Sequence, residues 1–162
     1  MSVRSNLSAL NCSLAKSLDI VGDGWTLLII RDLFLGATRF SEISQSLGIA
    51  KNILSERLGT LCEAKIVERG GTNTRPHYRL SEKGLELVPP LLGLLLWGDK
   101  YCADGKAPII FETKNENRLE ELRLIDETGQ TMLLLDLHAK SGEGAEFLTK
   151  IYLDRLTEKK NQ

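Results

Sequence analysis

The sequence predicts a mainly α-helical protein with a small amount of β-structure, followed by a small α+β extension at the C-terminus. Three observations support this fold class. Apolar residues recur at helical spacing in four segments before residue 65, and two short β-prone runs flank a Gly-rich loop at 70–76. At Gly105–Pro108 the sequence then changes from mainly helical periodicity to short strand-like runs. We therefore expect one domain over residues 1–104 and an extension over residues 105–162.

Four helices are expected in the first domain, each from its apolar spacing and its flanking residues. The first is capped by Asn11 or Ser13 and runs to about residue 21, and the other three are placed at 25–35, 40–47 and 51–64. The second is apolar on nearly all sides, which predicts a central and buried position. The fourth carries Leu54, Leu58 and Leu61 on one face and small polar residues on the opposite face.

A β-hairpin is expected directly after the fourth helix, because two short strands enclose the loop Gly-Gly-Thr-Asn-Thr-Arg-Pro. The strands are placed at 66–69 and 77–80. Another helix opens at Ser81, and Pro89-Pro90 is expected to kink it. In the extension, we expect strands at 109–111, 122–126 and 131–137 and a helix at 145–156.

The charge distribution favours a local rather than a global attraction to phosphate. The net charge of the chain is −1, but the window from Gly36 to Lys83 holds 8 basic and 5 acidic residues. No apolar stretch is long enough for a signal peptide or a membrane span. The 3 cysteines are widely spaced and include no CxxC pair, which disfavours a disulfide framework or a zinc site. We therefore expect a cytoplasmic protein that does not contact membranes.

Helices followed at once by a hairpin predict a winged helix-turn-helix domain. Its recognition helix is the fourth one, which can rest on the core by its apolar face while the polar face enters the DNA major groove. Glu56 would repel phosphate but can accept a hydrogen bond from a cytosine amino group. For these positions the alternative is a solvated helix face, and for Arg57 a structural ion pair competes with a phosphate contact. The candidate DNA-contacting residues are Arg39, Lys51, Asn52, Ser55, Glu56, Thr72, Asn73, Thr74 and Arg75.

Several motifs in order resemble those of the HxlR-type transcriptional regulators. They are the runs Asp23–Leu33, Leu54–Leu58 and Tyr78–Gly84, with Gly36, Arg39-Phe40, Leu61 and Trp97-Gly98. The resemblance covers about residues 7–104 and implies winged-helix homodimers that bind operator DNA through the fourth helix and the wing loop. Two features depart from the family. Ala50 stands where the family usually has a capping Ser, and residues 105–162 exceed the family core.

Cys12 is a candidate redox or electrophile sensor. It precedes the first helix, where unpaired N–H groups favour the thiolate, and the resemblance implies that some relatives sense oxidants through a cysteine at this place. The alternative is a half-buried small hydrophobe. Cys62 shares the apolar side of the fourth helix and is expected in the core. Cys102 is expected to be exposed or interfacial.

The run from Leu91 to Trp97 is too apolar for one side of a small domain. We interpret it as a dimer helix, because helix-turn-helix proteins read two half-sites with two copies. Burial under the extension is the alternative. The candidate interface residues are Leu91, Leu94, Leu95 and Trp97.

An enzyme is disfavoured, because His77 and His138 lie far apart in sequence and no P-loop, GxSxG or dinucleotide motif occurs. We expect no catalytic residue, metal or cofactor. The sequence therefore predicts a homodimeric regulator that binds specific sites in double-stranded DNA and responds to thiol oxidants or electrophiles. Two alternatives stay open: a winged helix that binds only proteins, and a regulator whose extension senses an unidentified small molecule.

Overall fold

A computed structural model describes residues 7–160, apart from the side chains of residues 136 and 157–160. By its internal contacts the chain divides into two units, which are Ile20–Leu122 and the combination of Met1–Asp19 with Arg123–Gln162. The predicted division lies instead at residue 105. The second unit combines the two ends of the chain because the Asn11 side chain is hydrogen bonded to the segment at 144–149.

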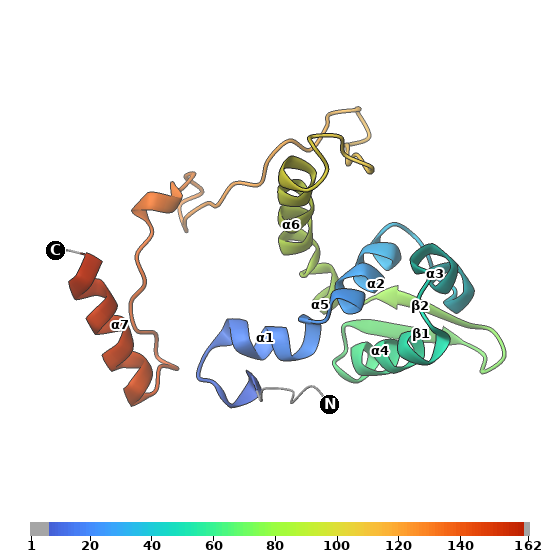
Figure 1. Cartoon of the computed structure of the whole chain (residues 1–162), viewed down its shortest axis with the longest axis horizontal. Helices are drawn as coiled ribbons and strands as arrows, with labels where there is room; N and C mark the ends of the chain where they lie inside the picture. The colour runs from blue at the N-terminus through green and yellow to red at the C-terminus, as the bar shows by residue number, and fades with distance from the viewer. Residues whose placement is uncertain (1–6, 161–162) are drawn as a thin grey trace. The chain divides into compact units, whose positions relative to one another are not determined.

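The four helices predicted before residue 65 and the hairpin form close to the predicted places (Figure 1). Figure 1 shows α2, α3 and α4 gathered around the hairpin, as expected for a winged helix. Two short 3-10 turns occur at Leu7–Ala9 and Leu134–Asp136. The bounds of the helices and strands are α1 Ser13–Val21, α2 Gly24–Phe34, α3 Phe40–Leu47, α4 Lys51–Glu63, β1 Val67–Gly71, β2 Pro76–Leu80, α5 Glu82–Leu85, α6 Val88–Tyr101 and α7 Phe147–Lys160.

The core of the larger unit is centred on α2, which packs against α3, α4, α6 and β2. Ile29 and Ile30 are fully buried there, which confirms the central position predicted for this helix. Both ends of α2 reach the surface, since Trp25 and Phe34 are exposed. The α4 side of the core consists of Leu54, Leu58 and Leu61. One apolar face therefore fixes α4 to the core.

The hairpin is a two-stranded antiparallel sheet that pairs Val67 with Leu80 and Gly71 with Pro76. Its turn needs glycine at position 71, where φ is +79° and a Cβ would collide with the Arg75 carbonyl oxygen. The hairpin is also tied to the loop before α3, because the Tyr78 N–H donates to the Thr38 carbonyl oxygen over 2.8 Å. The wing is thus attached to the helical part at its second strand.

The helix expected to kink at Pro89-Pro90 is divided earlier, at Glu86-Leu87, into α5 and α6. Both prolines then lie in the first turn of α6, where the missing N–H groups have no intrahelical partner in any case. The prolines start a helix instead of bending one.

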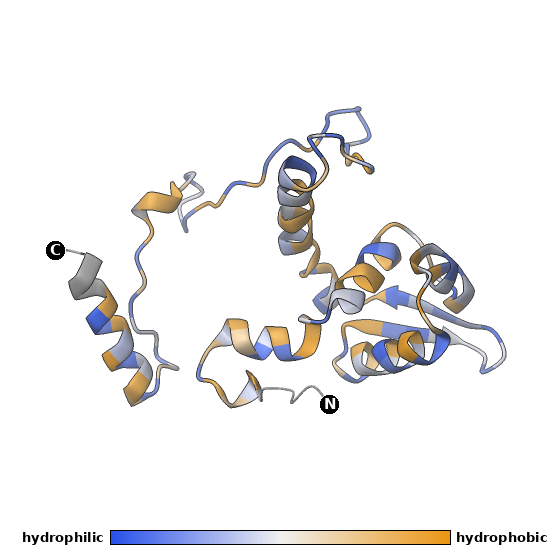
Figure 2. Ribbon diagram, viewed as in Figure 1, coloured by the Kyte–Doolittle hydropathy of each residue, from blue (hydrophilic) through white to orange (hydrophobic). Residues whose placement is uncertain are grey.

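The extension departs most from the prediction. Of the three strands expected there, only two isolated bridges form in the described residues, Glu112 with Arg118 and Ile125 with Thr131. The run expected at 131–137 finds no partner strand, and Leu133, Leu134 and Leu135 are 66–92% exposed; their turn is orange in Figure 2. A β-prone run becomes a strand only where a neighbour pairs with it. No described helix has the length and apolar character needed to cross a membrane.

Candidate nucleic-acid interface

The exposed side of α4 carries the polar residues predicted for the recognition face. Lys51, Asn52, Ser55 and Glu56 are all exposed, and the leucines opposite them are buried. Ala50 occupies the N-cap and makes no side-chain hydrogen bond, as expected from the missing Ser. The start of α4 therefore presents backbone N–H groups without a side-chain cap beside Lys51, a combination that suits a phosphate oxygen.

Arg39 links the start of α3 to the wing. Its Nη1 donates to the carbonyl oxygens of Arg75 at 3.2 Å and Pro76 at 3.0 Å. Its backbone N–H donates to the Glu42 carboxylate at 2.9 Å, and the Thr38 N–H donates to the same oxygen at 2.8 Å. The side chain of Arg39 remains exposed. Arg39 thus holds the wing against α3 in addition to lying at the surface.

These two amide donors lower the pKa of the Glu42 carboxyl below its usual range. A lowered carboxyl pKa means that the stabilising interaction is present above the unfolded-state value and is lost as the pH falls through the folded-state value. The hydrogen bonds that the Glu42 carboxylate accepts at the start of α3 are therefore present at neutral pH.

The wing loop is shaped by its own hydroxyl groups. The Thr72 hydroxyl accepts from the Arg75 N–H at 3.1 Å and lies 3.1 Å from the Thr74 hydroxyl. Asn73 and Arg75 are exposed at the tip. An open groove of about 500 Å³ separates the wing from the start of α3. Its lining residues are Arg39, Phe40, Ser41, Thr74, Arg75 and Pro76. The structure thus brings three of the predicted contact residues into one cationic groove.

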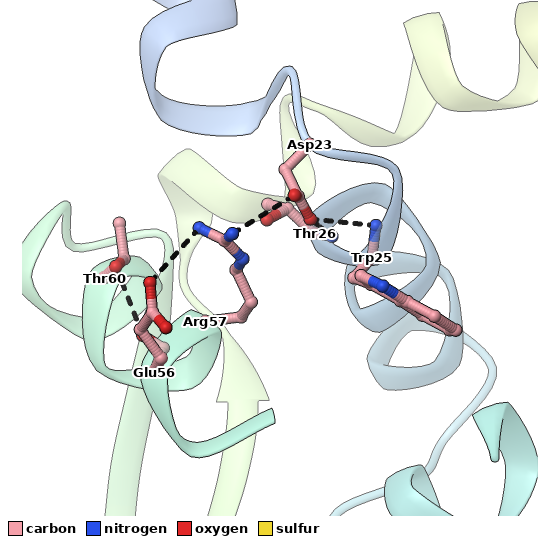
Figure 3. Close-up of polar contacts among 6 residues, drawn as sticks. All are labelled: Asp23, Trp25, Thr26, Glu56, Arg57 and Thr60. Carbon is pink, nitrogen blue, oxygen red and sulfur yellow. Dashed lines mark hydrogen bonds and ion pairs between the residues drawn. The ribbon is translucent and has the colours of Figure 1, made fainter. Parts of the chain in front are cut away.

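Arg57 forms the structural ion pair that sequence reasoning left open (Figure 3). Its Nη2 lies 3.2 Å from Asp23 Oδ2, and its side chain is only 16% exposed. Asp23 also caps α2, where its Oδ1 accepts from the Trp25 and Thr26 N–H groups. Sequence reasoning missed Asp23 as a site residue, although an Asp directly before a helix is a strong N-cap signal. The partner of Arg57 could not be read from the sequence.

Cys12 lies in the smaller unit, at the start of α1. Its carbonyl oxygen accepts from the Lys16 N–H at 3.1 Å, and its side chain is exposed. A cavity of about 360 Å³ is formed there between the start of α1 and the segment before and within α7. The cavity is lined by Asn11, Cys12, Ser13, Lys16, Gly142, Gly144, Ala145, Thr149 and Leu153.

The Asn11 side chain holds the two segments around this cavity together. Its Nδ2 donates to the Gly144 carbonyl oxygen at 3.1 Å, while its Oδ1 accepts from the Glu146 N–H and the Thr149 hydroxyl, both at 2.9 Å. The environment of Cys12 therefore includes part of the extension, which the sequence did not indicate.

The other two cysteines differ from Cys12 in their surroundings. Cys62 packs against the core, as predicted, and burial raises the pKa of its thiol. Because the thiolate is the nucleophilic form, this raised pKa makes the Cys62 thiol less reactive than an ordinary cysteine thiol. Cys102 follows α6 and is exposed.

The candidate dimer helix α6 keeps part of its apolar surface open. Leu94 is 54% and Trp97 55% exposed, whereas Leu91 and Leu95 are half-buried. The Trp97 ring packs on Tyr101, with 5.5 Å between ring centroids. One side of α6 packs on α2, and the other side presents an aromatic and aliphatic surface.

Known proteins share the sequence features of this domain. Residues 20–106 match the profile of the HxlR-like helix-turn-helix family. The uncharacterized HTH-type transcriptional regulator Rv3095 of Mycobacterium tuberculosis is 38% identical over 101 residues, which are 60% of this chain and 64% of that protein. The HTH-type transcriptional regulator YodB of Bacillus subtilis is 34% identical over 94 residues, 56% of this chain and 84% of YodB. This chain thus spans slightly less than two thirds of the mycobacterial relative.

The chain also resembles solved structures, among them the following two. PA1374 of Pseudomonas aeruginosa, described as a candidate transcription factor, has a TM-score of 0.62 and 30% identity and covers 87% of this chain and 99% of its own. The redox regulator HypR in its oxidized form has a TM-score of 0.51 and 27% identity and covers 55% of this chain and 96% of its own. None of these proteins is named as an enzyme. With the family profile matching more than half of its residues, the chain belongs to the HxlR-like helix-turn-helix family.

Proposed function

We propose that this protein is a transcriptional regulator that binds operator sites in double-stranded DNA as a homodimer. The observation that carries the proposal is the two-sided character of α4, whose leucines are buried while Lys51, Asn52, Ser55 and Glu56 are exposed. The major groove of B-DNA is wide enough for such a helix. The cationic groove at Arg39 and Arg75 suits the phosphate backbone beside it. Membership of a family of helix-turn-helix regulators supports the same function.

The homodimer part of the proposal is supported by the exposed apolar side of α6. Two copies of a helix-turn-helix protein dock on half-sites about 34 Å apart, which requires a fixed interface between them. Light scattering at micromolar concentration should therefore give twice the 18.0 kDa mass of one chain. Leu94→Glu, which places a charge on the exposed side of α6, should shift the protein toward monomer. A wild-type protein that stays monomeric across this range contradicts the dimer and the palindromic operator with it.

The α4 face and the wing are expected to contribute differently to DNA binding. Asn52→Ala or Ser55→Ala should cost about 1–3 kcal/mol at the preferred site and relax base preference there. Arg75→Ala should weaken binding to all sequences. It should also reduce the slope of the salt dependence by about one unit for each phosphate that a subunit no longer neutralises. Fluorescence anisotropy over a salt series, with operator and random duplexes, measures both effects.

Arg79→Ala is the matched control for the wing. It removes the same charge from the same hairpin, but Arg79 lies within β2 and is paired with Glu68 at 2.7 Å. We expect it to change the salt slope less than Arg75→Ala does. An Arg75→Ala protein with wild-type affinity and salt slope contradicts the wing contact. If wild type fails to bind random duplex even at low salt, the chain is a protein-binding winged helix instead.

We also propose that thiol oxidants or electrophiles control DNA binding through Cys12. The Cys12 thiol is exposed, stands at the start of a helix and lines a cavity large enough for a small reactive molecule. Lys16 lines the same cavity. The structural similarity to HypR, which is named as a redox regulator, supports this proposal.

A further inference from the structure

The side chain of Glu56 is connected to the start of α2 through Arg57 and Asp23. One carboxylate oxygen of Asp23, Oδ1, is fixed by hydrogen bonds that it accepts from the Trp25 N–H at 3.0 Å and the Thr26 N–H at 3.2 Å. Its other oxygen, Oδ2, lies 3.2 Å from Arg57 Nη2. The carboxylate of Asp23 is thus fixed by a helix cap and in turn orients the guanidinium (Figure 3).

Arg57 extends this connection to the exposed face of α4. Its Nη1 lies 3.8 Å from Glu56 Oε1, and Figure 3 shows the guanidinium between the two carboxylates. The Arg57 side chain is 16% exposed, whereas that of Glu56 is 62% exposed. The Glu56 main chain is also held within α4, where its carbonyl oxygen accepts from the Thr60 hydroxyl at 3.2 Å. A half-buried cation therefore lies within ion-pair distance of an exposed carboxylate on the face proposed to enter the groove.

We infer that Glu56 reads a cytosine in each operator half-site and that Asp23 and Arg57 are its positioning residues. This inference rests on the proposed DNA-binding function. A carboxylate only accepts hydrogen bonds, and the cytosine N4 amino group is the matching donor in the major groove. An unpaired carboxylate would be repelled by the phosphates. Arg57 lies near Oε1 of Glu56 and shares its positive charge between Glu56 and Asp23, so it reduces that repulsion in part and leaves Oε2 for the base.

Glu56→Gln is expected to switch the preferred base. An amide offers one donor and one acceptor, a pair that matches adenine N6 and N7 in place of the cytosine amino group. Selection of bound duplexes from a randomised pool should therefore change from cytosine to adenine at one position of each half-site. Competition between cytosine and adenine operators should change by about tenfold or more. The other positions should keep their preferred bases.

Glu63→Gln is the control for charge, since Glu63 is an exposed carboxylate at the far end of the same helix. It removes the same negative charge and should raise affinity for all duplexes alike, without a change of preferred base.

Asp23→Asn and Arg57→Lys test the positioning role. Asparagine at position 23 can still cap α2 but has no negative charge. Lysine at position 57 keeps the positive charge but lacks the planar guanidinium, which can face two carboxylates at once. Both should weaken discrimination at the cytosine position by about tenfold while discrimination elsewhere in the operator is unchanged. A purely structural role would instead lower affinity for all sites together.

Unaltered base preference in Glu56→Gln, with a wild type that selects a defined operator, overturns this inference and leaves the proposed function standing. A wild type that selects no sequence overturns both.

Discussion

Replacing Leu54 by alanine is expected to lower the free energy of unfolding of the winged-helix unit by about 2–5 kcal/mol. Leu54 is fully buried in α4 and shares the core with Ile29, Ile43 and Leu61. The loss combines the transfer of the removed methyl groups with the cavity that remains, because a close-packed interior relaxes only in part. Domains are stable by only about 5–15 kcal/mol, so this one change removes a large part of the total.

Urea unfolding followed by tryptophan fluorescence measures this loss, since Trp25 lies in α2 of the same unit. Leu85→Ala is the matched control, because Leu85 is 49% exposed in α5. Its effect should stay within about 0.5 kcal/mol. Equal midpoints for the two variants would mean that α4 is not anchored by its leucine face, and the exposed polar face would lose its structural basis.

Treatment with a thiol oxidant or a quinone is expected to release DNA from the wild type and to leave Cys12→Ser bound. Cys12 is exposed at the start of α1 and lines the open cavity to which residues between 142 and 153 also contribute. An adduct there adds bulk within that cavity and competes with the hydrogen bonds that Asn11 makes to Gly144 and Thr149. The two subunits must dock on half-sites at a fixed spacing of about 34 Å. A small shift of one subunit relative to the other is therefore sufficient to release the dimer from DNA.

The controls for this response are the other two thiols. Cys62→Ser and Cys102→Ser should still release DNA, and Cys62 should react slowest with an alkylating probe because burial raises the pKa of its thiol. Gel shifts with and without oxidant, and mass spectrometry of the modified peptides, give both readouts. Oxidant-insensitive binding by the wild type would rule out the Cys12 switch without affecting the DNA-binding proposal.

Much of the winged helix was predictable because its signals are local. The leucines of α4 recur at helical spacing, and Gly48 ends α3 in the left-handed conformation that glycine favours. The polar face of α4 follows from the same periodicity, since the residues opposite a buried face must be exposed. The wing was predictable from a Gly-rich loop between two β-prone runs, and Gly71 shows why, because its φ of +79° excludes most other residues.

The extension could not be predicted in the same way. Runs such as 131–137 have the composition of a strand, but a strand needs a partner at the right distance and register. The described residues of that segment provide only the single bridge from Ile125 to Thr131. Local composition therefore led to strands that the fold does not form. The helix predicted at 145–156 does form, although it begins two residues later, at Phe147, because a helix forms its backbone hydrogen bonds within its own segment.

The sequence by itself determined the helices, the wing and the polar face of α4, because each depends on residues within a few positions of one another. Only the tertiary structure decided which polar groups meet. Arg57 pairs with Asp23 rather than remaining free for phosphate, Arg39 donates to the wing carbonyls, and Asn11 joins α1 to the segment before α7. These partners lie far apart in the chain, and a side chain's choice among acceptors depends on distances that the packing of the apolar faces sets.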